Sequence, residues 1–175
     1  GVTLGDNRVA GDVLSLSNTA ASFADKNVGA AKPVSVSGIN VSGTDAANYT
    51  FNTTAATAAD ITARALTVSA AGQNRVYDGT ADASVTLGDN RVAGDVLSLS
   101  NAAASFADKN MGAAEPVSVS GINVSGTDAA NYTFNTTAAT AADITARPLT
   151  VRAAGQNRVF DGPADASLTL DDTPV

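Results

Sequence analysis

The chain has 175 residues, of which 15% are charged, and it carries a net charge of −7. It contains neither cysteine nor histidine, which excludes disulfides, thiolate nucleophiles, imidazole bases and His/Cys metal sites within these residues. Its basic residues form no cluster that could displace phosphate counterions, and no apolar run reaches the ~18 residues needed to cross a bilayer, so we expect neither nucleic-acid binding nor membrane insertion.

The sequence repeats itself almost exactly from its first residue. Residues 1–64 recur at 84–147, a shift of 83 positions, and 60 of these 64 residues are identical. A third copy starts at Leu149 and diverges after Arg158. We therefore predict three segments: a first repeat lacking its opening strands, a complete repeat, and the start of a third, diverged repeat, at 1–64, 65–147 and 148–175.

Short apolar alternations follow one another along the complete repeat, as is typical of β-strands. In chain order they are Leu66 and Val68, Val85 and Leu87, Leu97 and Leu99, Val117 and Val119, Ile122 and Val124, Tyr132 and Phe134, and finally Ile144. The alanine-rich stretches 102–104 and 138–142 lack a helical apolar stripe and are predicted as strand or loop. Asp78-Gly79 predicts a turn with positive φ, and the change of apolar phase at Gly121 predicts a bulge or bend.

About seven short antiparallel strands in one repeat predict an all-β fold, namely a two-layer β-sandwich. Asp128 and Tyr132 resemble the tyrosine corner of immunoglobulin-like domains, in which a tyrosine hydroxyl pins a connection between sheets, and their counterparts are Asp45 and Tyr49. This favours tandem immunoglobulin-like modules of 83 residues arranged end to end, with β-grasp-like modules as the alternative. Since no Gly/Ser-rich or Pro-rich linker separates the repeats, we expect stiff contacts between neighbouring repeats.

An ordered set of motifs resembles a known family. The motifs are Val76-Tyr77-Asp78-Gly79-Thr80, Ala107-Asp108-Lys109-Asn110, Val117-Ser118-Val119-Ser120-Gly121 and Asp128-Ala129-Ala130-Asn131-Tyr132. Together they resemble the YDG-type repeat, which is similar to the MBG repeats and occurs in filamentous haemagglutinin-like secreted bacterial adhesins. The third copy keeps the Tyr-Asp-Gly turn only as Phe160, Asp161 and Gly162. The resemblance implies an extracellular stalk module, secreted or on the bacterial cell surface, without catalytic residues.

The residues themselves also argue against an enzyme. A Ser-Lys pair would need Lys26, Lys32 or Lys109, but the counterpart of Lys32 in the second copy is Glu115. Paired carboxylates in turns cap backbone N–H groups far more often than they catalyse. We therefore expect no catalytic activity.

Calcium is the one cofactor that the chain could bind, because it offers only oxygen ligands. Asp78, Asp82 and Asp128 lie in predicted turns and are the candidate ligands, but no Asp-x-Asp-x-Asp loop is present. The alternative for the three carboxylates is ordinary turn capping. No other cofactor is expected.

We weigh three functions. The first, which we predict, is a structural stalk or spacer that projects a binding tip away from the cell, and whose parent protein reaches a host surface through other parts. The second, an alternative, is a multivalent glycan- or mucin-binding module. The third is a filament subunit that associates head to tail, because the first copy lacks its opening Leu-Thr-Val and Tyr-Asp-Gly strands while residues 149–170 carry an equivalent pair.

Overall fold

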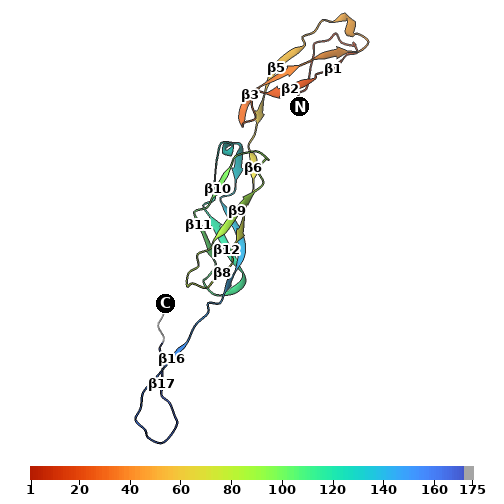
Figure 1. Ribbon diagram of the computed structural model, residues 1–175. Coiled ribbons are helices and arrows are strands. Elements are labelled where there is room, and N and C mark those ends of the chain that lie inside the picture. Colours follow the sequence, from red (N-terminus) through yellow and green to blue (C-terminus); the bar gives the residue numbers. More distant parts are fainter. Residues whose placement is uncertain (172–175) are drawn as a thin grey trace.

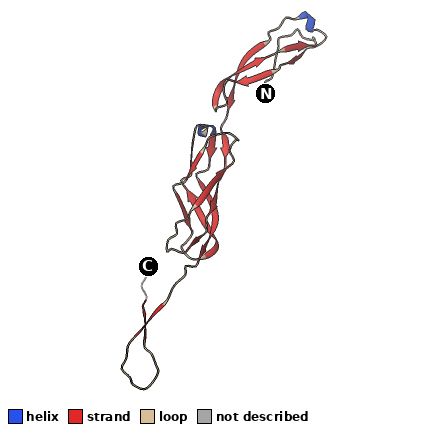
Figure 2. Cartoon of the chain, viewed as in Figure 1, coloured by secondary structure: helices blue, strands red, loops and turns tan. Residues whose placement is uncertain are grey.

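A computed structural model describes residues 1–171 as an elongated all-β chain (Figure 1; Figure 2). Two β modules follow one another, and a hairpin extends beyond the second module (Figure 1). Within the described range, helical structure is confined to two short 3-10 turns, η1 (Ala46–Asn48) and η2 (Ala129–Asn131). Neither turn is long and apolar enough to cross a membrane.

The first module contains five strands: β1 (Ser15–Ser17), β2 (Ala20–Phe23), β3 (Gly29–Ser37), β4 (Asn40–Ser42) and β5 (Thr54–Ile61). Strands β2, β3 and β5 form an antiparallel sheet, and β1 pairs with β4 in a short ribbon.

The second module contains ten strands: β6 (Arg64–Leu66), β7 (Val68–Gly72), β8 (Arg75–Val76), β9 (Val85–Asp89), β10 (Ser98–Ser100), β11 (Ala103–Phe106), β12 (Gly112–Ser120), β13 (Asn123–Ser125), β14 (Tyr132–Phe134) and β15 (Thr137–Thr145). Its largest sheet has the order β11-β12-β15-β8, and the pairs β10-β13, β14-β6 and β7-β9 accompany it. The prediction of about seven purely antiparallel strands is wrong, because β6 runs parallel to β14 and β8 runs parallel to β15. Apolar alternation reports which residues are extended, but not the direction of their partners.

A single apolar cluster fills the second module. Its buried members are Leu66, Val68, Leu97, Phe106, Val117, Val119, Ile122, Val124, Tyr132, Ala142 and Ile144. Most of these come from the predicted alternations, so that part of the core prediction is confirmed. The alanine-rich stretch 138–142 lies in β15, and residues 103–104 of the other stretch lie in β11, so both stretches are in strands or loop as predicted.

The predicted turn at Gly79 and the predicted bend at Gly121 are both present. Gly79 has a φ of +88° and Gly121 has a φ of +64°, and Gly121 lies in the bend between β12 and β13. One irregularity is not predicted: the register of β12 on β15 shifts between Gly112 and Glu115, where Ala114 also has a positive φ of 53°. The backbone N–H of Ala114 donates to Asp143 Oδ1 at 2.8 Å, which stabilises this conformation.

The chain ends in a two-stranded antiparallel hairpin of β16 (Arg152–Gly155) and β17 (Leu168–Asp171), which we call the tail hairpin. It projects beyond the second module, away from the first (Figure 1). Apolar side chains in this hairpin and in the residues just before it are largely exposed to solvent, at Leu149, Val151, Val159, Phe160 and Leu168.

Candidate functional site: the junction between repeats

The two modules are joined by a very short connection. Strand β5 ends at Ile61 and β6 begins at Arg64, where Arg64 pairs with Tyr132 of β14. Arg64, the last residue of the first copy in sequence, therefore already belongs to a strand of the second module. A connection this short restricts how the two modules can move relative to each other.

A lysine of the first module binds two carboxylates of the second. Lys26, in the loop after β2, places its ammonium nitrogen 2.8 Å from Asp95 Oδ1 and 2.8 Å from Asp128 Oδ1. The lysine side chain is 64% exposed, whereas both aspartate side chains are only 12% exposed. One cation thus bridges two carboxylates, from the loop between β9 and β10 and from the segment before η2, and offsets part of the repulsion between them.

Two hydrogen bonds extend this contact. The backbone N–H of Val28 donates to Asn131 Oδ1 at 2.9 Å, and Asn131 Nδ2 donates to Asn27 Oδ1 at 3.2 Å. The segment from Lys26 to Val28 therefore contacts the η2 region of the second module through a charge, a side-chain amide and a backbone amide. We call these contacts the junction clamp.

The tyrosine-corner-like residues hold the carboxylates of the clamp in place. The Tyr132 hydroxyl donates to Asp95 Oδ2 at 2.6 Å and accepts a hydrogen bond from the backbone N–H of Val92 at 3.0 Å. Asp128 Oδ2 accepts the backbone N–H of Val96 at 2.9 Å. Tyr132 and Asp128 thereby fix both ends of the loop that carries Asp95.

The first module repeats this arrangement. The Tyr49 hydroxyl donates to Asp12 and accepts from the backbone N–H of Val9 at 3.0 Å, and Asp45 Oδ2 accepts the backbone N–H of Val13 at 2.8 Å. Asp12 and Asp45 are the counterparts of Asp95 and Asp128.

The clamp lowers the pKa of both carboxyl groups. Hydrogen bonding to Lys26 and then to Tyr132 lowers the pKa of Asp95, and hydrogen bonding to Lys26 and then to the backbone of Val96 lowers the pKa of Asp128. The same contacts with Asp128 and Asp95 raise the pKa of Lys26. All three groups are therefore more firmly charged than in a free chain.

The first two repeats each carry both halves of the clamp, because Asp12 and Asp45 are the counterparts of the two aspartates, and Lys109 is the counterpart of Lys26 and lies exposed after β11. The sequence shows that these lysines and aspartates recur at the repeat spacing. It does not show that the lysine of one copy binds the aspartates of the next, since that depends on how the modules pack.

The aspartate of the Tyr-Asp-Gly turn is held by neighbouring residues of the same turn. Asp78 Oδ1 accepts hydrogen bonds from the backbone N–H of Thr80 at 3.0 Å and from its hydroxyl at 2.9 Å, and Asp78 also pairs with Arg75 at 3.0 Å. The backbone N–H of Tyr77 donates to the carbonyl of Thr145 at 2.8 Å. The turn thus attaches the β8 region to the end of β15.

The diverged copy of this turn lies in the tail hairpin. Asp161 pairs with Arg158 at 3.1 Å, and Gly162 has a φ of +104°. Phe160 is 92% exposed there, so the turn keeps its local geometry without a neighbouring strand.

The three candidate calcium ligands have separate surroundings. Asp78 caps the turn, Asp82 forms an isolated antiparallel bridge with Ser105, and Asp128 binds Lys26. Across the described part of the chain, no group of three or more acidic side chains is arranged to hold a metal ion.

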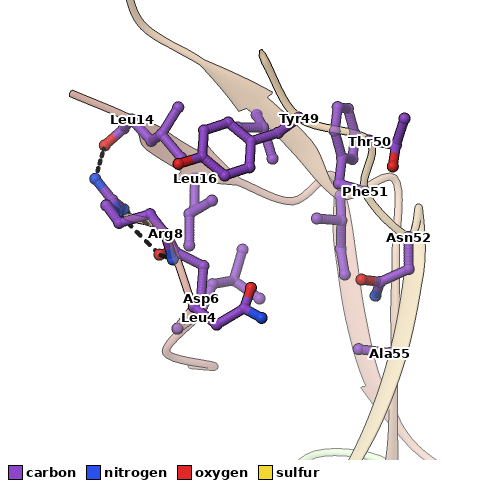
Figure 3. A pocket seen from close by; sticks show the side chains of 14 residues that line it. Leu4, Asp6, Arg8, Leu14, Leu16, Tyr49, Thr50, Phe51, Asn52 and Ala55 are labelled. Atoms are coloured by element: carbon purple, nitrogen blue, oxygen red, sulfur yellow. Dashed lines mark hydrogen bonds and ion pairs between the residues drawn. The ribbon is translucent and has the colours of Figure 1, made fainter. Parts of the chain in front are cut away.

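A hollow of about 540 Å³ lies on the first module (Figure 3). Its apolar lining includes Leu4, Leu14, Leu16, Ile39, Tyr49 and Phe51. Arg8 crosses one side, bonded to Asp6 and to the carbonyl of Leu14 at 2.8 Å (Figure 3). We call this hollow the head groove.

Comparison with known proteins gives one match. Residues 2–58 and 62–141 match the YDG domain family, which agrees with the resemblance of the sequence motifs. No curated protein and no solved structure was found to be significantly similar to the chain.

Proposed function

Because the chain belongs to the YDG domain family, we propose that it is a structural stalk segment of a secreted or cell-surface bacterial adhesin. In this proposal the tandem repeats hold a binding tip away from the cell, and the parent protein reaches the host surface through other parts. The observation that carries it is the junction clamp, in which Lys26 of one module binds Asp95 and Asp128 of the next.

A spacer must resist bending, and the junction supplies two sources of resistance. The short connection between β5 and β6 limits the possible orientations. The clamp then ties the modules together at a second point, through Lys26, Asn27 and Val28. Two points of attachment suppress the free rotation that a single flexible linker would allow.

The same clamp can recur along a longer array of repeats. Since both of the first two copies carry the lysine and both aspartates, each added repeat of this kind can form the same clamp with its neighbour. Reach then grows with copy number, while every junction keeps the same geometry.

We propose further that the folding unit is a module of 83 residues with an immunoglobulin-like sandwich architecture. Its support is the Tyr132 hydroxyl, which pins the loop between β9 and β10, as a tyrosine corner pins a connection. The parallel pairs of β6 with β14 and of β8 with β15 depart from a purely antiparallel sandwich, and β-grasp-like modules are the alternative.

Binding of glycans or mucin is the weaker candidate, because such sites need exposed aromatic side chains that are part of a stable surface. Phe23 is 39% exposed, but its counterpart Phe106 in the second module is 3% exposed. The exposure of Phe23 therefore belongs to the first module alone and is not a property of the repeat. We propose separately that the chain has no enzymatic role and no cofactor.

The experiment is to compare chains of two, three and four complete repeats by small-angle X-ray scattering and to screen them on a glycan array. A stalk predicts that each repeat lengthens the particle by a constant ~30–45 Å, without specific glycan binding. Compact particles of irregular length, or specific binding that increases with copy number, would contradict the proposal.

A further inference from the structure

We propose that the second module is built to carry tension along the chain. Its first and last strand segments run side by side in the same direction, so they slide apart only when several hydrogen bonds break together. This resistance is a property of the single module. It goes beyond the stalk proposal and does not depend on it.

The chain enters the second module at one end and leaves it at the other. Strand β6 begins at Arg64, next to the first module, and β15 ends at Thr145, from which the chain runs on to the tail hairpin (Figure 1). Tension in the chain therefore pulls Arg64 and Thr145 in opposite directions along the module. The load falls first on the entry segment, which we define as β6, β7 and β8, and on β15 at the exit.

The entry segment and β15 are in direct contact. The backbone N–H of Gly72 donates to Thr140 Oγ1 at 3.3 Å, and the backbone N–H of Tyr77 donates to the carbonyl of Thr145 at 2.8 Å. Between these contacts β8 pairs in parallel with β15. A Cβ added to Gly72 would lie 2.7 Å from the carbonyl oxygen of Ala141, so glycine is what lets the two backbones approach this closely.

We call the contact of residues 72–77 with residues 140–145 the seam. A side chain strengthens its middle, because Asn74 bonds twice to one residue of the opposite segment. Asn74 Oδ1 accepts the backbone N–H of Asp143 at 2.8 Å, and Asn74 Nδ2 donates to Asp143 Oδ2 at 3.3 Å. The asparagine therefore adds hydrogen bonds where the two segments have no ladder of their own.

Arg75 anchors the seam to the rest of the module. Its guanidinium lies 5.1 Å from the centre of the Phe106 ring and donates to Asp78 Oδ2 and Thr80 Oγ1, both at 3.0 Å. Its backbone carbonyl accepts a hydrogen bond from the Thr145 hydroxyl at 3.3 Å. A pull on β15 is therefore passed on to the Tyr-Asp-Gly turn and to a buried side chain of the core.

The beginning of the entry segment is attached as well. Strand β6 pairs in parallel with β14, and Asn135, the residue after β14, bonds both backbone groups of Val68. Asn135 Oδ1 accepts the N–H of Val68 at 2.8 Å, and Asn135 Nδ2 donates to its carbonyl at 2.9 Å. A pull at Arg64 is consequently shared by contacts along the whole entry segment.

Tension loads the seam in shear. The entry segment is drawn toward its beginning and β15 toward its end, so two parallel neighbours are pulled past each other along their common axis. Hydrogen bonds in a parallel pair are evenly spaced along the strands, so the bonds of the seam stretch together. Opening the seam from one end would instead break them one after another. Forced unfolding is governed by the unfolding rate, which should therefore be much lower in the shear direction.

Force spectroscopy in two pulling directions tests the proposal. The chain holds no cysteine, so two introduced cysteines decide where the handles attach. Thr62→Cys with Ala146→Cys pulls the second module through its two ends and loads the seam in shear. Val76→Cys with Ala146→Cys separates two neighbouring positions at one end of the seam and opens it bond by bond. All three positions are exposed.

Unfolding through the two ends should need a force several times higher than opening the seam from one end. The thermodynamic stability of a module does not depend on the direction of pulling, so a difference between directions reports the geometry of the loaded strands. Equal forces in the two directions, or a lower force through the ends, would overturn the proposal.

A matched pair of asparagine variants then locates the resistance. Asn74→Ala removes both bonds to Asp143 and should lower the force needed in the Thr62/Ala146 direction. Asn123→Ala changes an exposed asparagine of β13 outside the seam and should leave that force unchanged. The same force for both variants would show that the seam does not carry the load. The comparison of directions stands without these variants, so it decides the question even if Asn74→Ala fails to fold.

Discussion

The ammonium nitrogen of Lys26 lies 2.8 Å from a carboxylate oxygen of Asp128, although the two residues belong to different modules. Asp128 in turn accepts the backbone N–H of Val96, and so joins the contact between modules to the loop structure of its own module. The contact between the modules and the loop structure of the second module therefore share Asp128.

The junction clamp should depend on pH at both extremes. The clamp lowers the pKa values of Asp95 and Asp128. Their contribution to the stability of the clamp is therefore complete above the ordinary aspartate pKa, about 4, and is lost as the pH falls through the lowered values. The pKa of Lys26 is raised, so its contribution is complete below about 10 and is lost at higher pH.

We therefore expect the scattering profile to stay constant between about pH 4 and pH 10 and to show bending outside that range. High salt should weaken the clamp in part, because the Lys26 side chain is 64% exposed. A profile that changes between pH 5 and pH 9 would show that other groups control the junction.

Two phenylalanines at equivalent positions should differ in their effect on stability. Phe106→Ala removes a side chain that is 3% exposed and should cost about 3–5 kcal/mol. Phe23→Ala removes one that is 39% exposed and should cost about 1 kcal/mol or less. Hydrogen exchange of the backbone amides in β12 and β3 measures each module separately. Equal losses in the two modules would contradict the burial difference.

The Tyr132 hydroxyl should stabilise the second module. Tyr132→Phe keeps the ring but removes hydrogen bonds to Asp95 and Val92, and should lower the melting temperature by a few degrees. Tyr49→Phe is the matched variant in the first module and should have a smaller effect, because Tyr49 is only half-buried whereas Tyr132 is buried. Circular dichroism during heating detects both changes. An unchanged melting curve for Tyr132→Phe would show that the Tyr132 hydroxyl does not stabilise the second module.

Calcium should have no effect on the rod. The Lys26 ammonium already neutralises Asp128, and Asp78 is engaged by Thr80 and Arg75. Scattering with millimolar calcium and with a chelator should therefore give the same profile. Heat released on calcium titration, with lengthening of the particle, would show that the carboxylates bind the ion after all.

Much of the fold could be predicted from the sequence, because local chemistry sets it. Alternation at Val117 and Val119 predicted buried strand residues, and Asp78-Gly79 predicted a turn with positive φ. The parallel pairing of β6 with β14 could not be predicted, since it joins residues far apart in the sequence. Nor could the clamp, because Lys26 is 69 residues from Asp95 and no local pattern joins them.

The most direct test of the account compares Lys26→Ala with Lys109→Ala by small-angle X-ray scattering of the monomeric chain. The two lysines are equivalent in the repeat, but only Lys26 has a carboxylate pair opposite it among the described residues. The account predicts that Lys26→Ala gives a bending particle with a shorter mean length, while Lys109→Ala matches the unchanged chain. Identical profiles for all three chains would contradict the claim that this clamp stiffens the rod.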